Sequence, residues 1–415
     1  MVNMQMNTCS PGKYSHYALL LLLSVNLLNY IDRQILYAVF PLIKDDFALT
    51  DTSLGFLGSA FMLCYMVSAP IFGWIGDHTS RVKLASAGLV VWSAATSLAG
   101  FASRYYTLFL ARLSVGIGEA SFSTVSPGLL ADYFPKERRG RVLSCFYLAI
   151  PVGSAFGYLL GGILGQKFGW QSAFFIVGIP GVLLAIPVWF LFEPQRGGGE
   201  KDAGESIQPT QAGFRSLFSN RPYIANTLAM TAMTFAMGGL AQWLPTFLYR
   251  VHKLDLVSAN TFFGIITVFA GISGTLIGGW LGDYFEKKTN KGYVLVSGWG
   301  LLLGVPLSVY AILTPVLINC LAAIFFAEFF LFLNTGPLNT VIVNVTHPGI
   351  RARAFALNIF VIHALGDAVS PTVLGWLSDL WGLRYSLLVT PAVIALASFF
   401  CFLCGHFIEK ENIHM

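Results

Sequence analysis

A handful of ionisable side chains lie inside long apolar runs of this 415-residue chain. They are Asp32, Arg33, Arg112, Glu119, Glu328 and Asp367. A charge at the centre of a membrane costs from about 2.5–3.5 kcal/mol upward, so such residues are candidates for function. Arginine can bind phosphate or carboxylate through two parallel hydrogen bonds. A carboxyl group in a low-dielectric site holds its proton more tightly than one in water, and can exchange it near neutral pH. These residue types predict an anion site combined with proton carriers.

Helical spacing places several of these residues on common faces. At about 100° per residue, Arg112 and Glu119 fall about 20° apart on a helix. Ser123 extends this stripe by one turn. The same spacing recurs 216 residues later, where Glu328 begins the corresponding stripe. Both stripes should face a central polar cavity, because contact with lipid would penalise them.

The first apolar run separates its two charges. Arg33 and Tyr37 share a face, whereas Asp32 points about 100° away from Arg33 and can engage another partner. We interpret Asp32 and Glu119 as proton carriers. The residues predicted to bind substrate are Arg33, Arg112, Tyr37, Ser123 and Glu328. The alternative for Asp32 and Arg112 is a static structural ion pair.

A later run carries His363 and Asp367, four residues apart. This spacing lets the two side chains touch, and we interpret them as a local hydrogen-bonded pair. A metal site is not predicted.

These residues must be positioned by membrane-spanning helices. The chain is 55% hydrophobic and only 11% charged, against about 25% charged in soluble domains. A spanning helix needs roughly 20 mostly apolar residues. Twelve such runs occur, at residues 16–41, 53–75, 82–102, 105–128, 142–165, 171–192, 222–249, 259–281, 292–313, 315–340, 353–377 and 384–408. We therefore predict an all-α membrane protein, with six-helix bundles at 1–192 and 222–415 and a polar linker at 193–221.

The distribution of basic residues predicts the orientation. Of the 25 Lys and Arg residues, 17 fall in tails and loops on the side of the termini and linker, 6 on the other side, and 2 within spans. Basic loops stay in the cytoplasm. Both termini and the linker are therefore expected to be cytoplasmic.

Internal repeats divide each half again. The pattern Gly-Trp-(Ile/Leu)-x-Asp begins at Gly73, Gly279 and Gly375, at the ends of the second, eighth and eleventh spans. Nested three-helix repeats within two six-helix halves are typical of the major facilitator fold. We assign a gating role, by charges that pair across helix ends, to Gly73, Asp77, Arg81 and Asp283. The alternative is that these basic loops only fix the orientation.

The fifth span carries small residues on one face, at Gly153, Gly157 and Gly161. Small residues let helix backbones approach closely. We expect this stripe to lie between the two halves, and ordinary packing within one half is the alternative.

Other function classes lack their motifs. The segment beginning at Gly282 has no second glycine for a phosphate-binding loop, and neither H-E-x-x-H nor G-x-S-x-G occurs, so neither an ATP-driven pump nor an enzyme is expected. Cys401 and Cys404 form a C-x-x-C pair, but within a hydrophobic run. Most of the basic residues lie in tails and loops between the spans, and they do not indicate a nucleic-acid-binding face.

Three segments resemble the Spinster branch of the major facilitator superfamily. They are NYIDR at 29–33, GEASFST at 118–124 and FYLAIPVG at 146–153. The resemblance implies transport of lysophospholipids or sphingosine phosphates with proton coupling at Asp32 and Glu119, beside Arg33 and Arg112. Tyr158 stands where a related antiporter motif has proline, which leaves exchange and symport both open.

We predict a proton-coupled secondary transporter for an amphiphilic anion such as a lysolipid. A small organic-anion/proton symporter and a non-transporting membrane receptor are the alternatives. The short termini and linker favour a bacterial inner membrane, where we expect a monomer with the proton as its coupling ion and no other cofactor.

Overall fold

The computed structural model describes residues 12–195, 214–347 and 350–413. Most of the predicted linker, residues 196–213, lies outside the described residues. In the described part of the chain, twelve helical segments are long and apolar enough to cross a membrane. Each overlaps one predicted span, and the bounds differ by at most five residues, as where 105–128 becomes Tyr105–Tyr133. The predicted all-α membrane fold is confirmed.

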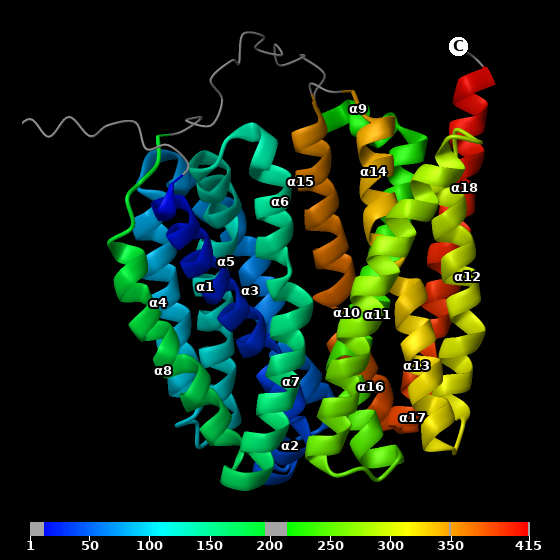
Figure 1. Ribbon diagram of the computed structural model, residues 1–415. Helices are drawn as coiled ribbons and strands as arrows, with labels where there is room; N and C mark the ends of the chain where they lie inside the picture. The colour runs from blue at the N-terminus through cyan, green and yellow to red at the C-terminus, as the bar shows by residue number, and fades with distance from the viewer. Residues whose placement is uncertain (1–11, 196–213, 348–349, 414–415) are drawn as a thin grey trace, which may run out of the picture.

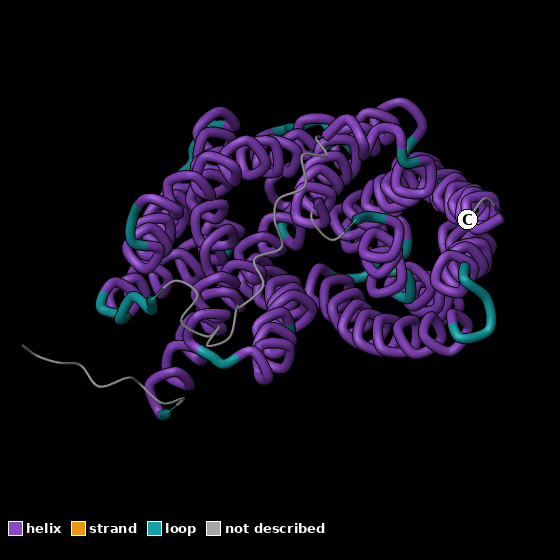
Figure 2. The backbone as a smooth tube through the Cα atoms, turned by 90° about the horizontal axis from the view of Figure 1, so that it is seen from above, coloured by secondary structure: helices purple, strands orange, loops and turns teal. Residues whose placement is uncertain are grey.

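The helices form two bundles side by side (Figures 1 and 2). The first contains α1 (Lys13–Ala38), α2 (Phe40–Phe47), α3 (Asp51–His78), α4 (Arg81–Ala99), α5 (Tyr105–Tyr133), α6 (Lys136–Tyr147), α7 (Ala149–Phe168) and α8 (Trp170–Trp189). The second contains α9 (Phe214–Ser219), α10 (Arg221–Val251), α11 (Leu256–Glu286), α12 (Gly292–Leu313), α13 (Leu317–Phe332), α14 (Thr335–Val345), α15 (Arg351–Ile362), the π-helical turn η2 (His363–Asp367), α16 (Ser370–Trp381), α17 (Leu383–Leu387) and α18 (Val389–Ile413).

The start of α1, the end of α18 and α9 lie at one end of the molecule, which we call the linker side (Figure 1). The opposite end, which carries α2 and α17, is the far side. Large apolar side chains such as Phe269 and Leu276 are exposed along the outside, whereas Asn226 and Gln242 are buried. This distribution is the one expected when lipid surrounds the bundle.

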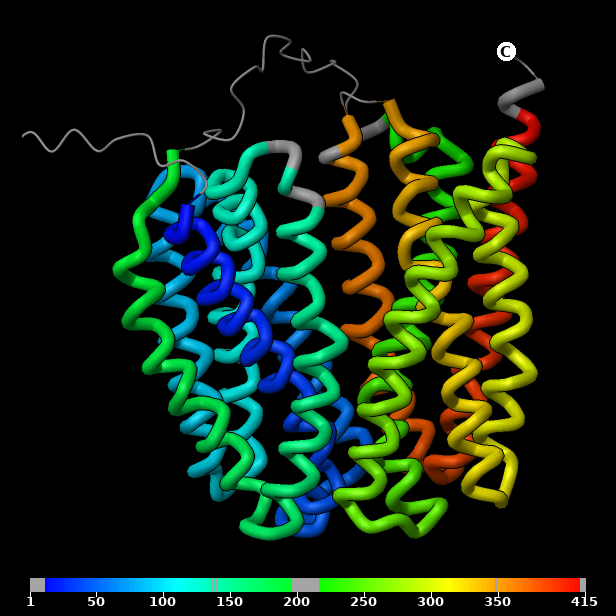
Figure 3. The backbone as a smooth tube through the Cα atoms, in the orientation of Figure 1, coloured from blue at the N-terminus to red at the C-terminus, as the bar shows by residue number. Residues whose placement is uncertain are grey.

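The eleventh span is interrupted, which the hydropathy pattern does not predict. It consists of α15, η2 and α16, which the orange part of the tube in Figure 3 follows. The N–H of Ala368 donates to the carbonyl of His363 at 3.1 Å, a bond to the fifth residue back. Pro371, near the start of α16, cannot donate a backbone hydrogen bond to the preceding turn. Single π-turns of this kind frequently occur at functional sites.

The small-residue face of α7 packs within the first half, so the expected position between the halves is wrong for this stripe. A Cβ on Gly157 would lie 2.6 Å from the carbonyl oxygen of Ile31, and one on Gly153 would lie 2.8 Å from that of Leu27. A different face of α7 meets the second half, where a Cβ on Gly162 would lie 3.1 Å from Asn260. The helix therefore joins α1 to α11 through two faces.

Candidate functional site

Four of the predicted charges form two ion pairs between α1 and α5. Arg33 Nε lies 2.7 Å from Glu119 Oε2, and Arg112 Nη1 lies 3.5 Å from Asp32 Oδ1. The neighbours Asp32 and Arg33 thus engage different partners, as their angular separation predicts. The side chains of Arg112 and Glu119 are fully buried and Asp32 is 1% exposed, whereas 15% of the Arg33 side chain is exposed.

A third helix completes the surroundings of Asp32. The hydroxyl of Thr96 on α4 donates to Asp32 Oδ2. Helices α4 and α5 can approach this closely because Gly118 has no side chain; a Cβ there would lie 2.6 Å from the backbone nitrogen of Trp92. The Arg112 guanidinium keeps Nε and Nη2 without a hydrogen-bond partner in the described residues. The Asp32–Arg112 pair is therefore buried, and only some of its hydrogen-bonding groups have partners.

Aromatic rings surround the arginines. The Arg33 guanidinium lies 5.0 Å from the ring centres of Tyr30 and Tyr65 and 5.1 Å from that of Phe61. The same Phe61 ring is 5.1 Å from the guanidinium of Arg112. Such contacts favour the cation by about 0.5–2 kcal/mol each. Sequence reasoning missed these rings and Thr96, although the i, i+4 spacing of Phe61 and Tyr65 is visible in the sequence.

A central cavity of about 140 Å³ lies between the two halves. It is lined by Tyr30, Arg33, Gln34, Tyr37, Gly58, Phe61, Met62, Gly238, Ala241, Asp367 and Pro371. Of the predicted site residues, Arg33 and Tyr37 reach its wall, whereas Asp32, Arg112 and Glu119 are buried behind it. Arg33 therefore connects the buried acid Glu119 with the cavity.

The π-turn contributes an acidic group to the opposite wall. Asp367 lines the cavity and contacts His363 Nδ1 at 2.9 Å. The spacing of these residues predicts this local contact. The position of Asp367 on the wall opposite Arg33 was not predicted, because it depends on how the interrupted helix packs against α10.

Two predicted substrate residues lie away from the cavity. Glu328 on α13 is buried, and it accepts a hydrogen bond from the Thr267 hydroxyl of α11 at 3.0 Å. Ser123 is half-buried on α5, one turn beyond Glu119. Neither residue lines the cavity, so the stripes of α5 and α13 do not form one continuous wall in this conformation.

The predicted gating residues form contacts within each half. Arg81 Nη1 lies 2.6 Å from Asp132 Oδ2, and Arg81 Nε lies 3.0 Å from Glu193 Oε1. These bonds tie the start of α4 to the end of α5 and to the segment that follows α8. Asp77 lies in the last turn of α3. In the second half, Asp283 accepts a hydrogen bond from the Tyr293 hydroxyl at 2.7 Å.

The remaining gating residue, Gly73, is a point of ordinary packing. A Cβ there would lie 3.6 Å from the Thr124 methyl group, within the same half.

The pKa of Glu193 reflects these bonds. Burial alone would raise it, but hydrogen bonds from the Val82 backbone, the Ser80 hydroxyl and Arg81 outweigh burial and lower the pKa below its ordinary value. Glu193 is therefore ionised at neutral pH, and its hydrogen bonds hold the start of α4.

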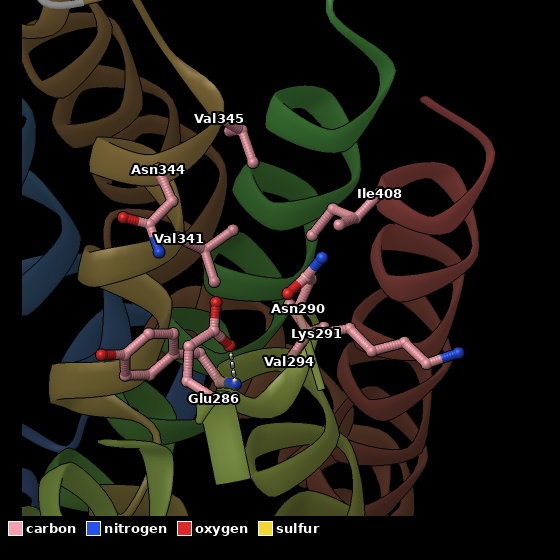
Figure 4. A pocket seen from close by; sticks show the side chains of 9 residues that line it. Glu286, Asn290, Lys291, Val294, Val341, Asn344, Val345 and Ile408 are labelled. Atoms are coloured by element: carbon pink, nitrogen blue, oxygen red, sulfur yellow. Dashed lines mark hydrogen bonds between the residues drawn. The ribbon is translucent and has the colours of Figure 1, made fainter. Parts of the chain in front are cut away.

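A second cavity, of about 290 Å³, opens at the linker side of the second half (Figure 4). Its polar wall includes Glu286, which accepts a hydrogen bond from the Tyr293 backbone at 3.2 Å. None of the six ionisable residues predicted inside the spans lines this cavity. We therefore place the candidate site at the smaller central cavity, where arginine, carboxylates and both halves meet.

Comparison with known proteins shows the family of the chain. Residues 22–371 match the family model of the Major Facilitator Superfamily. The chain is 33% identical to the protein spinster of Drosophila melanogaster over 89% of this chain and 63% of that protein. It is also 33% identical to the sphingosine-1-phosphate transporter SPNS2 of Danio rerio, over 94% of this chain and 86% of that protein.

A solved structure gives the same result at the level of the fold. The crystal structure of a bacterial homologue of the human lysosomal transporter Spinster, in an inward-facing and unoccupied conformation, superposes with a TM-score of 0.88 at 25% identity. The match covers 96% of this chain and 98% of that one. The chain therefore belongs to the Spinster family of the major facilitator superfamily, and it is a multi-pass membrane transporter.

Proposed function

We propose that this transporter couples protons to the movement of an amphiphilic anion such as a lysophospholipid or a sphingosine phosphate. The relative from Danio rerio is a sphingosine-1-phosphate transporter, which supports a sphingolipid-like substrate. The observation that carries the proposal is the position of Arg33, which pairs with a buried carboxylate and at the same time faces the central cavity.

This position makes Arg33 a shared partner. While Glu119 is ionised, its carboxylate occupies the Arg33 guanidinium at 2.7 Å. A proton on Glu119 removes that charge and frees the guanidinium for an anionic head group in the cavity. By linkage, the anion then raises the proton affinity of the protein by the same factor. Proton and anion therefore bind together.

Asp32 is the second proposed proton carrier. It is held by Thr96 and Arg112 behind the cavity wall. Arg112 forms an ion pair with Asp32, so a change in the charge of Asp32 alters the electrostatic field at Arg112. Arg112 and Arg33 both contact the Phe61 ring, which links this change to Arg33.

The cavity volume bears on the class of substrate. Sites that enclose drug-sized ligands measure about 300–1,000 Å³, whereas this cavity measures about 140 Å³. It can hold a head group while an acyl chain extends out of it, as an amphiphile requires. The same volume is the observation that favours the second candidate, a small organic anion enclosed completely.

We further propose that the chain works as a monomer in a bacterial inner membrane, with the linker side in the cytoplasm. The support for this orientation is the excess of Lys and Arg on the linker side.

Uptake into proteoliposomes tests the function. Purified protein is reconstituted, a pH gradient is imposed, and uptake of sphingosine phosphate, a lysophospholipid or glycerol phosphate is measured. We expect lipid uptake that stops when a protonophore collapses the gradient. Lipid uptake indifferent to the gradient would refute coupling, and uptake of glycerol phosphate alone would establish the small-anion alternative.

A further inference from the structure

The 290 Å³ cavity of the second half is lined by counterparts of residues that form an ion-paired cluster in the first half. In that cluster, Arg81 is the first residue of α4, and its guanidinium contacts Asp132 at 2.6 Å and Glu193 at 3.0 Å. Glu193 also accepts a hydrogen bond at 2.9 Å from the N–H of Val82, the second residue of α4. One cation therefore balances two carboxylates at the linker side of the first half.

In the second half, the matching helix begins with a residue that has no side chain. Helix α12 is the third span of its half, as α4 is of the first, and it begins at Gly292. A Cβ there would lie 2.1 Å from the backbone nitrogen of Glu286, so no larger residue fits without a backbone shift. The N–H of Tyr293, the second residue of α12, donates to the Glu286 carboxylate at 3.2 Å. Glu286 thus takes the role of Glu193, but no ion pair joins it to a basic side chain in the described residues.

An amide stands where the first half has its second carboxylate. Asn344 is the residue before the last of α14, as Asp132 is of α5. Asn344 and Asn290 both line the cavity. Neither side-chain amide has a hydrogen-bond partner within the described part of the chain. The cavity wall therefore presents one carboxylate and two amides that are available to a ligand.

The charges around the cavity favour a cation. Glu286 and Lys291 are the charged residues that line it. The Lys291 ammonium pairs with Glu409 at 2.8 Å, and its side chain extends away from Glu286 (Figure 4). Carboxylates bind guanidinium and ammonium groups through charge-assisted hydrogen bonds. The volume is close to the lower limit of about 300 Å³ for small-molecule sites, and Val341 and Ile408 supply an apolar wall.

We propose that this cavity binds a small organic cation with a guanidinium or ammonium group, in the role that Arg81 has in the first half. The cation pairs with Glu286 and donates hydrogen bonds to the amide oxygens of Asn290 and Asn344. It joins the end of α11 and the start of α12 to α14, as Arg81 joins α4 to α5. This inference depends neither on the proposed substrate nor on proton coupling.

Isothermal titration calorimetry of the full-length protein in detergent tests the site, with propylguanidinium as the probe. The wild type should bind propylguanidinium, and it should not bind propylurea, which has the same shape without the charge. Glu286→Gln should weaken binding roughly tenfold or more, because hydrogen bonds to charged groups are the stronger ones. Asn344→Asp supplies the second carboxylate of the first-half cluster and should tighten binding, which a misfolded variant could not do.

Asp255→Asn is the matched control. Asp255 caps the start of α11, where it accepts a hydrogen bond from the Ser258 N–H at 3.0 Å, and asparagine caps a helix about equally well. This variant removes one negative charge from the opposite end of the same helix, so its affinity for propylguanidinium should equal that of the wild type.

Three results would overturn the proposal. They are no binding of propylguanidinium to the wild type, equal weakening in Glu286→Gln and Asp255→Asn, and affinity in Asn344→Asp that is no higher than in the wild type. If Glu286→Gln does not fold, Asn344→Asp still decides the question. Because no substrate or proton gradient is used, failure here is distinct from failure of the proposed transport.

Discussion

Arg33 and Glu119 are in contact at 2.7 Å, but they differ in access to the cavity. The Glu119 side chain is fully buried, and Arg33 is 15% exposed and lines the cavity wall. A ligand can therefore reach the arginine without reaching the acid. Communication between the two takes place through their shared bond.

Glu119→Gln should make anion affinity less sensitive to pH. The amide cannot be ionised, so Arg33 stays available to the head group at every pH. Thermal-shift titration with sphingosine phosphate in mildly acidic and mildly alkaline buffers measures this. Wild-type protein should bind more tightly in the acidic buffer, and the difference in affinity between the two buffers should be smaller for Glu119→Gln. If the variant kept the pH response of the wild type, Glu119 would have a structural role and would not be a proton carrier.

Arg33→Gln should destabilise the fold, because it leaves the Glu119 carboxylate buried without its partner. Removal of one member of a buried pair costs about 3–5 kcal/mol. Combination with Glu119→Gln should recover most of that loss, and chemical unfolding of both variants measures it. A double variant no more stable than Arg33→Gln would contradict the proposed pairing.

Thr96→Val should cost about 1–3 kcal/mol, since it removes the hydroxyl that donates to buried Asp32 while preserving the shape of the side chain. Thr124→Val is a suitable control, because its hydroxyl bonds to Ala120 in the same helix. Unfolding measurements compare the two. Equal losses would show that the contact with Asp32 contributes nothing specific.

Gly157→Val should separate α1 from α7, because its Cβ would meet the Ile31 carbonyl at 2.6 Å. Overpacking of this kind costs typically about 1–3 kcal/mol, and here it also displaces the turn that carries Asp32 and Arg33. We expect transport to be lost. Gly279→Ala is the control, since nothing lies within 4 Å of the added methyl group, and it should transport normally.

Glu193 should stabilise the first half in a pH-dependent way. Its folded pKa lies below the ordinary 4.5, so its contribution is fully present above 4.5 and is lost as pH falls through the folded pKa. With 33% of its side chain exposed, the contribution is about 1 kcal/mol at most. The stability difference between wild type and Glu193→Gln should vanish at low pH. A difference that grew on acidification would have the wrong sign.

The spans could be predicted because lipid imposes a minimum apolar length, which is a local property of the chain. The partners of the charges were harder to predict. Helical spacing separated Asp32 from Arg33, but it could not show that Arg33 meets Glu119, since that depends on how α1 crosses α5. The aromatic setting of Arg33 was missed because aromatic side chains are common throughout membrane helices.

The two-faced packing of α7 has a consequence for the transport cycle. Its glycine face fixes it to α1, so α1 and α7 travel together when the halves rock, and the contact with α11 is the one that slides. The two ion pairs between α1 and α5 then move with these helices as part of one rigid body. Over the cycle the backbone segments that carry these residues keep their relative positions, and what alternates is the aqueous compartment to which they are open.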